Sequence, residues 1–202
     1  MELILKGIVA GLFVSIMVGP IFFGLIQLSV EKGARAGIVF ACGIWLSDLL
    51  YVFAVHKGFG FIGEDPKFIL LFGVLGSLIL MAFGVGIYVS NVRRPMNDSI
   101  DVRNGAGYFF KGVLINLFNP AVLLIWVGIF TNISTFDSHE QWHFVVAMLS
   151  VVALTDVIKA VFASQIGRQL NEARLKMIKN TSAVTIGVFG LFLFVRTILK
   201  VV

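Results

Sequence analysis

The stretch AGIVFACGIWLSDLLYVFAVH, residues 36–56, decides the fold, because it is almost entirely apolar and long enough to cross a lipid bilayer. A helix rises about 1.5 Å per residue, so about 20 residues span a hydrocarbon core of roughly 30 Å. Asp48 lies in the middle of this stretch. An ionised carboxylate at the bilayer centre costs about 2.5 to 3.5 kcal/mol. We therefore expect Asp48 to face the interior of a helix bundle, to pair with another group, or to bind a proton.

Further apolar runs of similar length indicate a polytopic membrane protein; they cover residues 3–30, 68–92, 112–133, 144–166 and 181–199. The 202-residue chain is 58% hydrophobic and 13% charged, whereas soluble domains carry about 25% charged residues. Its mean hydropathy is +0.98. The connections between the runs are too short to fold as separate domains. The chain is therefore predicted to be all-α, with six transmembrane helices in a single membrane domain over residues 1–202.

A proline followed by an aspartate occurs twice in the same order, each inside an apolar run. The two sets are Gly19-Pro20 with Ser47-Asp48, and Asn119-Pro120 with Thr155-Asp156. A repeat unit with an odd number of spans enters the membrane from opposite sides on its two occurrences, which makes the repeat inverted. The pattern predicts an inverted three-plus-three repeat, with halves at about residues 1–92 and 108–202. Chance recurrence of the four residues is the alternative.

Each proline is expected to interrupt its helix. Pro20 leaves the carbonyl of Ile16 without its usual donor, so local backbone groups become free to contact a substrate or an ion. Asn119-Pro120 offers the same arrangement, and Asn116 adds an amide one turn earlier. For both breaks, Gly19-Pro20 and Asn119-Pro120, two interpretations stay open: contact with a substrate and a purely structural kink.

The two aspartates have different local partners. Lys159 follows Asp156 by three residues, a spacing at which helix side chains meet, so the two can form a buried ion pair. Asp48 has no such cation nearby, and only Ser47 and Tyr51 are close on the same helix. Asp48 is therefore the stronger candidate for binding a substrate amine or for proton coupling. Asp156 and Lys159 are candidates for the same site, with a structural ion pair as the alternative.

The distribution of Lys and Arg predicts the orientation, because short cytoplasmic loops are enriched in both. The loops after the first, third and fifth spans carry ten of them, against four on the other side. The ten are Lys32, Arg35, Arg93, Arg94, Arg103, Lys111, Arg168, Arg174, Lys176 and Lys179; the four are Lys6, Lys57, Lys67 and Lys200. We therefore expect a multi-pass membrane protein with both termini outside.

Several function classes are disfavoured by composition. The formal net charge of +5 is divided among separate short loops, which fits membrane orientation better than nucleic-acid binding. Cys42 is the single cysteine, so dithiol redox chemistry within the chain is excluded. No G-x-x-x-x-G-K-[ST] motif occurs, so the energy for any transport must come from an ion gradient or a partner. No cofactor is expected. The sequence leaves the oligomeric state open, and a homodimer is one of the possibilities.

The segment from His139 to His143 reads H-E-x-x-H, which on a helix places two imidazoles on one face with a carboxylate base, as in zinc proteases. A third ligand is needed, and His56, Glu64 and Asp65 are the plausible sources. The ordinary interpretation is the start of a helix at the outer interface, with Trp142 in the aromatic belt. A membrane metalloenzyme is therefore a rival function, although no metal site and no catalytic residue is expected.

Three segments together resemble the LysE/RhtB amino-acid exporter family. They are Gly19-Pro20 through Gln27, Glu31-Lys32-Gly33-Ala34-Arg35-Ala36-Gly37, and Gly43 through Asp48. Asn116-Leu117-Phe118-Asn119-Pro120 resembles the family's N-x-x-N-P segment in the fourth span, and length and span number also agree.

The resemblance implies a secondary transporter of the bacterial cytoplasmic (inner) membrane that exports amino acids or small amino-acid derivatives, coupled to the proton gradient and working by alternating access. The family residues carried over by position are Gly19, Pro20, Asp48, Asn116, Asn119 and Pro120. Many members have Lys after the N-P pair, whereas this chain has Ala121, so the exact substrate is open. A non-transporting membrane assembly subunit is the second rival.

Overall fold

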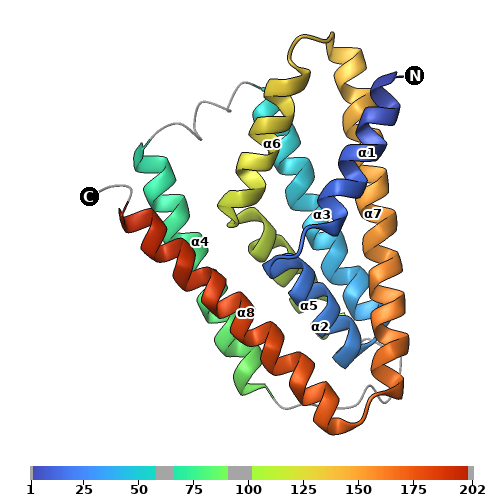
Figure 1. Ribbon diagram of the computed structural model, residues 1–202, viewed down its shortest axis with the longest axis vertical. Coiled ribbons are helices and arrows are strands. Elements are labelled where there is room, and N and C mark those ends of the chain that lie inside the picture. Colours follow the sequence, from blue (N-terminus) through green and yellow to red (C-terminus); the bar gives the residue numbers. More distant parts are fainter. Residues whose placement is uncertain (1, 58–65, 91–101, 200–202) are drawn as a thin grey trace.

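A computed structural model describes residues 2–57, 66–90 and 102–199, and the regular structure in these ranges is helical throughout (Figure 1). The helices are α1 (Glu2–Ile16), α2 (Pro20–Lys32), α3 (Ala34–His56), α4 (Pro66–Val89), α5 (Val102–Leu117), α6 (Pro120–Ile133), α7 (Ser138–Gln169) and α8 (Glu172–Leu199). The predicted all-α class is confirmed for these residues.

The described residues contain four helices long and apolar enough to cross a membrane: α3, the Leu70–Val89 part of α4, α7 and α8. Two further candidates are bent pairs of shorter helices, α1 with α2 at 70° and α5 with α6 at 62°. The predicted number of six spans agrees with the structure when each bent pair is counted as one span.

The helices extend beyond the predicted apolar runs. Helix α5 begins at Val102, although its apolar run begins at residue 112, and α7 begins at Ser138 rather than at 144. Asp137 stabilises the start of α7, because its side chain accepts a hydrogen bond from the backbone N–H of Glu140 at 2.8 Å. Polar helix ends remain helical beyond the bilayer when they are capped in this way, so hydropathy alone underestimates helix length.

The two breaks occur at the predicted prolines. Pro20 and Pro120 are the first residues of α2 and α6, where a proline is tolerated because the first-turn N–H has no helical partner anyway. The side chain of Asn119 caps α6 by accepting a hydrogen bond from the Ala121 N–H at 3.1 Å. Gly19 precedes α2 in an extended conformation and offers no side-chain cap. The two breaks are therefore similar in position and different in chemistry.

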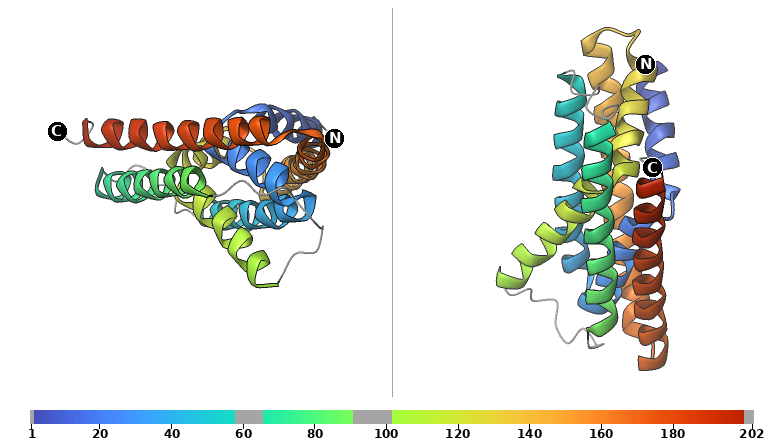
Figure 2. Two further views of the ribbon diagram at one scale, coloured as in Figure 1. Left: turned by 90° about the horizontal axis from the view of Figure 1, so that it is seen from below. Right: turned by 90° about the vertical axis from the view of Figure 1, so that its left-hand side faces the viewer.

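Helix pairing is regular across the molecule. Helices α4 and α8 run side by side, and so do α1 and α7, as well as α3 and α5 (Figures 1 and 2). Helix α3 also contacts α7 near the centre, and α2 packs against α3, α7 and α8. The four half-helices α1, α2, α5 and α6 thus end in the middle of the bundle, where α3 and α7 pass.

Glycines set the closest helix contacts. A Cβ added at Gly112 on α5 would overlap the carbonyl oxygen of Phe40 on α3, and one added at Gly11 on α1 would overlap that of Met148 on α7. Small residues allow such close approach of helix backbones in membranes. Gly11 therefore serves helix packing in the first span.

We predict that Gly112→Ala destabilises the protein by about 1 to 3 kcal/mol, because the methyl group forces α3 and α5 apart. Gly107→Ala on the same helix is the matched control, since nothing lies within 4 Å of a Cβ at that position. Thermal unfolding of the detergent-purified proteins measures both. Equal melting temperatures for the two variants would contradict the close contact described here.

Candidate functional site

A cavity of about 200 Å³ lies where the four half-helices end. Side chains from α1, α2, α3, α5, α6, α7 and α8 line it. Seven of the eight residues singled out from the sequence are among them: Gly19, Pro20, Asp48, Asn116, Asn119, Asp156 and Lys159. The eighth, Pro120, is the first residue of α6, directly after Asn119. Candidate residues up to 140 positions apart in the chain, from Gly19 to Lys159, thus line one central pocket.

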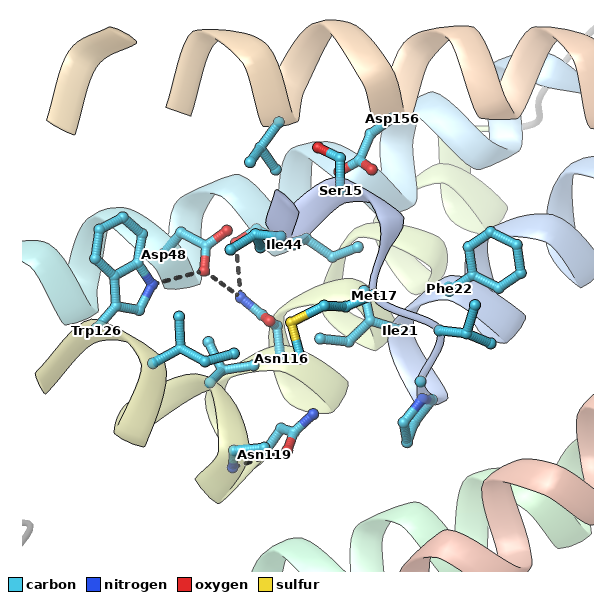
Figure 3. A pocket seen from close by; sticks show the side chains of 18 of the residues that line it. Ser15, Met17, Ile21, Phe22, Ile44, Asp48, Asn116, Asn119, Trp126 and Asp156 are labelled. Atoms are coloured by element: carbon cyan, nitrogen blue, oxygen red, sulfur yellow. Dashed lines mark hydrogen bonds between the residues drawn. The ribbon is translucent and has the colours of Figure 1, made fainter. Parts of the chain in front are cut away.

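Asp48 is held by two neutral donors. Its Oδ1 accepts hydrogen bonds from Asn116 Nδ2 at 2.9 Å and from Trp126 Nε1 at 3.1 Å. Figure 3 shows the two donors converging on the carboxylate. Asp48 is 7% exposed. A carboxyl group bonded only through one oxygen to neutral donors keeps these bonds whether or not its other oxygen carries a proton.

Asn116 also ties the end of α5 to the middle of α3. Its Nδ2 lies 2.7 Å from Ser47 Oγ and 3.1 Å from the Ile44 carbonyl oxygen, in addition to Asp48. The Ser47 hydroxyl donates to the backbone of its own helix, to the Ile44 carbonyl at 2.8 Å. Ser47 therefore acts on the site through Asn116 rather than on Asp48 directly.

Asp156 has a cationic partner, as its spacing from Lys159 predicts. Lys159 Nζ donates to Asp156 Oδ1 at 2.9 Å, and the Asp156 side chain is 8% exposed against 22% for Lys159. A longer contact of 3.4 Å joins Trp45 Nε1 to the other carboxylate oxygen. Both indole donors, Trp45 and Trp126, were missed by the sequence analysis, since neither is at a helical spacing from the aspartate it contacts across the bundle.

Tyr51 lies one turn after Asp48 on α3, and its hydroxyl bonds to a group on another helix. The hydroxyl donates to the carbonyl oxygen of Leu117, the last residue of α5. The carbonyls at the end of a helix have no helical donor. Tyr51 therefore satisfies a helix end that the break before Pro120 leaves open.

Two contacts recur in the two halves of the bundle. Asn116 and Ser15 are the penultimate residues of α5 and α1, and each bonds to the residue directly before an aspartate. The second of these bonds, Ser15 Oγ to Thr155 Oγ1, is 2.7 Å long.

The glycine contacts follow the same relation. Gly112 lies four residues before Asn116 and meets the carbonyl of Phe40, and Gly11 lies four residues before Ser15 and meets the carbonyl of Met148. Phe40 and Met148 each lie eight residues before an aspartate of the pocket.

The first turn of α2 faces the pocket without a side-chain cap. Ile21 and Phe22 line the cavity, and N–H groups in the first turn of a helix have no intrahelical acceptor. These donors and the positive end of the helix dipole favour an anionic group at this position.

The H-E-x-x-H segment lies elsewhere, in the first turns of α7. The rings of His139 and His143 are 4.6 Å apart between centroids, and they border a separate surface cavity with Ile4 and Trp142. Within residues 2–57, 66–90 and 102–199, no group of three His, Cys, Asp or Glu side chains could hold a metal ion. The rings of His56 and Trp142 are 5.1 Å apart, and the other two suggested ligands, Glu64 and Asp65, lie outside the described residues. The metalloenzyme alternative is therefore not favoured.

Comparison with known proteins finds one family model and several relatives named for efflux. The family model described as LysE type translocator matches residues 12–197. A protein of Bacillus subtilis (strain 168) named for amino acid efflux, YcgF, is 27% identical over 203 residues, which cover 95% of each chain. The leucine efflux protein of Salmonella typhimurium (strain LT2) is 26% identical over 127 residues, 62% of this chain and 60% of that protein. No solved structure matches the chain.

We predict that Asp156→Asn lowers the yield of folded protein, because it leaves the Lys159 ammonium in the bundle without its anion. Breaking a buried pair costs about 3 to 5 kcal/mol, so the double variant Asp156→Asn/Lys159→Met should recover most of the yield. The exposed pair Glu2 and Lys6, 2.7 Å apart, supplies the control Glu2→Gln, for which no loss is expected.

The measurement is the amount of monodisperse protein after detergent extraction. A normal yield for Asp156→Asn alone would show that the pair is not structurally important.

Proposed function

Because this chain belongs to the LysE-type translocator family, we propose that it is a secondary transporter that exports amino acids or small amino-acid derivatives from the cytoplasm. The names of the relatives, an amino acid efflux protein and a leucine efflux protein, support this substrate class. Its apolar helices and its family support a multi-pass protein of the bacterial inner membrane.

The central pocket carries the proposal, since it offers complementary groups for both charges of an amino acid. The uncapped first turn of α2 and the Lys159 ammonium suit a carboxylate. The carboxylate of Asp48 suits an ammonium group. Between them the wall is apolar, with Met17, Ile21 and Val122 among the lining residues. This wall fits an aliphatic side chain such as that of leucine.

Ala121 lines the same pocket, at the position where many family members carry Lys. A cation is therefore missing from the start of α6. Lys159 lies in the pocket on α7, and the proposal gives it the role of balancing the substrate carboxylate from that side. In this chain the positive charge of the pocket lies on α7 and not at the start of α6. This supports a substrate orientation that differs from the one in family members that carry Lys after the N-P pair.

Asp48 is proposed to be the proton-coupling residue. Its hydrogen-bond donors, Asn116 and Trp126, are neutral and remain satisfied in either protonation state. Asp156 differs from Asp48 in having a cationic partner, Lys159, within its own helix. The absence of an ATP-binding motif from the sequence is consistent with energy from an ion gradient.

The recurring contacts support an inverted three-plus-three repeat. Gly11 and Ser15 match Gly112 and Asn116 at one constant spacing, and their partners on α7 and α3 match at another. If the Pro and Asp pattern recurred in the sequence only by chance, there would be no reason for the contacts of neighbouring residues to recur in the structure as well.

Equivalent helices in the two halves share some contacts and differ in one, and the difference supports alternating access. Helix α2 packs against α7 and α8, as its counterpart α6 packs against α3 and α4, but the extensive contact of α2 with α3 has no equal between α6 and α7 in the described residues. In an inverted repeat the two halves can exchange these arrangements, which would open the pocket to the opposite side.

The orientation proposed from the Lys and Arg bias, with both termini outside, can be tested by labelling. We predict that in a Cys42→Ala background an impermeant maleimide labels Ser138→Cys in intact cells and spares Ala173→Cys until the membrane is opened. Both positions are exposed in the structure, so access differs only by membrane side. The reverse pattern would place the termini inside.

We predict that Asp48→Asn inserts at the wild-type level and loses export driven by a pH gradient. Neutralising the residue removes an insertion cost of about 2.5 to 3.5 kcal/mol together with the titrating group. The measurement is efflux of labelled leucine from preloaded vesicles, with and without an imposed pH gradient. Asp137→Asn is the control, because Asn caps a helix as well as Asp does. Export by Asp48→Asn with unchanged gradient dependence would remove Asp48 from the coupling step.

A further inference from the structure

A second cavity, of about 440 Å³, lies between α2, α4 and α5. Its polar lining consists of Gln27, Glu31, Lys32, Ser90, Tyr108 and Lys111. It shares no lining residue with the central pocket among the described residues. The cavity lies at the carboxyl end of α2, toward the membrane face that the charge bias assigns to the cytoplasm.

Glu31 is the unusual residue of this cavity. It is 3% exposed, and its Oε1 is the buried side-chain atom without a hydrogen-bond partner in the described part of the chain. Gln27 lies one turn earlier on the same helix and lines the same cavity. Buried polar atoms are paired in the large majority of cases, so an unpaired carboxylate oxygen needs an explanation.

The nearby cation Lys179 does not supply that partner. Its Nζ donates to the carbonyl oxygens of Tyr88 at 2.8 Å and Ser90 at 2.7 Å, at the end of α4. Lys179 is itself buried and fixes the end of α4 against α8. The Glu31 oxygen therefore lines the cavity with an unused capacity to accept a hydrogen bond.

Positive charge borders the same cavity. Lys32 follows Glu31 at the end of α2, and Lys111 lines the cavity from α5. An ammonium group on a ligand would satisfy Glu31, and the two lysines would attract a carboxylate. A zwitterion such as an amino acid carries an ammonium and a carboxylate group close together. These two groups match the one acidic and two basic side chains that line this small cavity.

An apolar layer separates this cavity from the central pocket. At the level of Gly24, an added Cβ would contact the side chains of Phe40, Ile115 and Phe83. The rings of Phe40 and Phe83 are 6.5 Å apart between centroids. From Ile21 in the central pocket to Leu28 in the second cavity, α2 advances by about 10 Å. The two cavities thus lie in series along α2.

We propose that the second cavity is an amino-acid binding site that receives the substrate before it reaches the central pocket. Glu31 binds the substrate ammonium, and Lys111 with Lys32 binds its carboxylate. The apolar layer around Gly24 must move for the substrate to pass. This inference rests on the proposed export of amino acids and adds an entry site to it.

The test uses purified protein in lipid nanodiscs, with Cys42→Ala and a reporter cysteine at Ala82→Cys, a position that lines the cavity. The probe is a mixture of the nineteen standard amino acids other than cysteine, whose thiol would consume the labelling reagent, followed by each of the nineteen alone. Binding in the cavity should slow the reaction of the cysteine with a cationic methanethiosulfonate, roughly tenfold at ten times the dissociation constant. Glu31→Gln and Lys111→Gln should each abolish this protection.

Two controls separate the entry site from its surroundings. Glu172→Gln removes an exposed carboxylate and should keep the protection. Asp48→Asn alters the central pocket and should also keep it. Glu31→Gln should fold at least as well as the parent protein, because it replaces a buried carboxylate that has an unpaired oxygen; Lys111→Gln changes an exposed side chain and tests the same site without altering the core.

An unreactive reporter cysteine, an unchanged labelling rate at millimolar amino acids, or protection that survives both Glu31→Gln and Lys111→Gln would overturn the entry site. Loss of protection in Asp48→Asn would also overturn it, since the two cavities would then act as one. Failure of the export proposal is distinguishable, because it would appear as wild-type protein that protects the reporter and yet moves no amino acid across vesicle membranes.

Discussion

The cost of ending a helix inside a membrane governs this structure. Helix ends expose backbone N–H and C=O groups, and each such group left without a partner in hydrocarbon costs several kcal/mol. Here the ends of α1, α2, α5 and α6 meet around one pocket. Asn119 satisfies the start of α6, and the Tyr51 hydroxyl satisfies the end of α5. The start of α2 has no side-chain cap, and it is the end that the export proposal assigns to a substrate carboxylate.

The two halves use one geometry with different chemistry. Tyr51 and Lys159 each lie three residues after an aspartate of the pocket. Tyr51 binds a helix end and leaves Asp48 to neutral donors, whereas Lys159 pairs with Asp156. A strictly symmetric site could not distinguish a substrate ammonium from a substrate carboxylate. The unequal partners of the two aspartates provide that distinction, and they also leave one carboxyl group free to exchange a proton in the proposed mechanism.

The sequence predicted the features that depend on local spacing. Proline positions predicted both helix breaks, apolar run lengths predicted the candidate spans, and the spacing of Asp156 and Lys159 predicted their ion pair. Seven of the eight candidate residues line the central pocket.

Features that depend on long-range packing could not be predicted. Trp126 reaches Asp48 across 78 positions of the chain, and no periodicity relates the two. The burial of Glu31 at the end of α2 likewise depends on helices that come later in the chain, α7 and α8 among them. The hydrogen bond from Tyr51 to Leu117 could not be predicted for a similar reason, because the unsatisfied carbonyl lies at the end of α5, 66 positions along the chain.

The central claim is that the pocket between the four helix ends serves amino-acid export. The most direct measurement is a profile of amino acids and their derivatives in the medium of cells that express the chain, compared with cells that lack it, after both are loaded with peptides. The account predicts that one amino acid or a small group of them accumulates outside the expressing cells and falls inside them. Identical profiles inside and outside both cell types would contradict it.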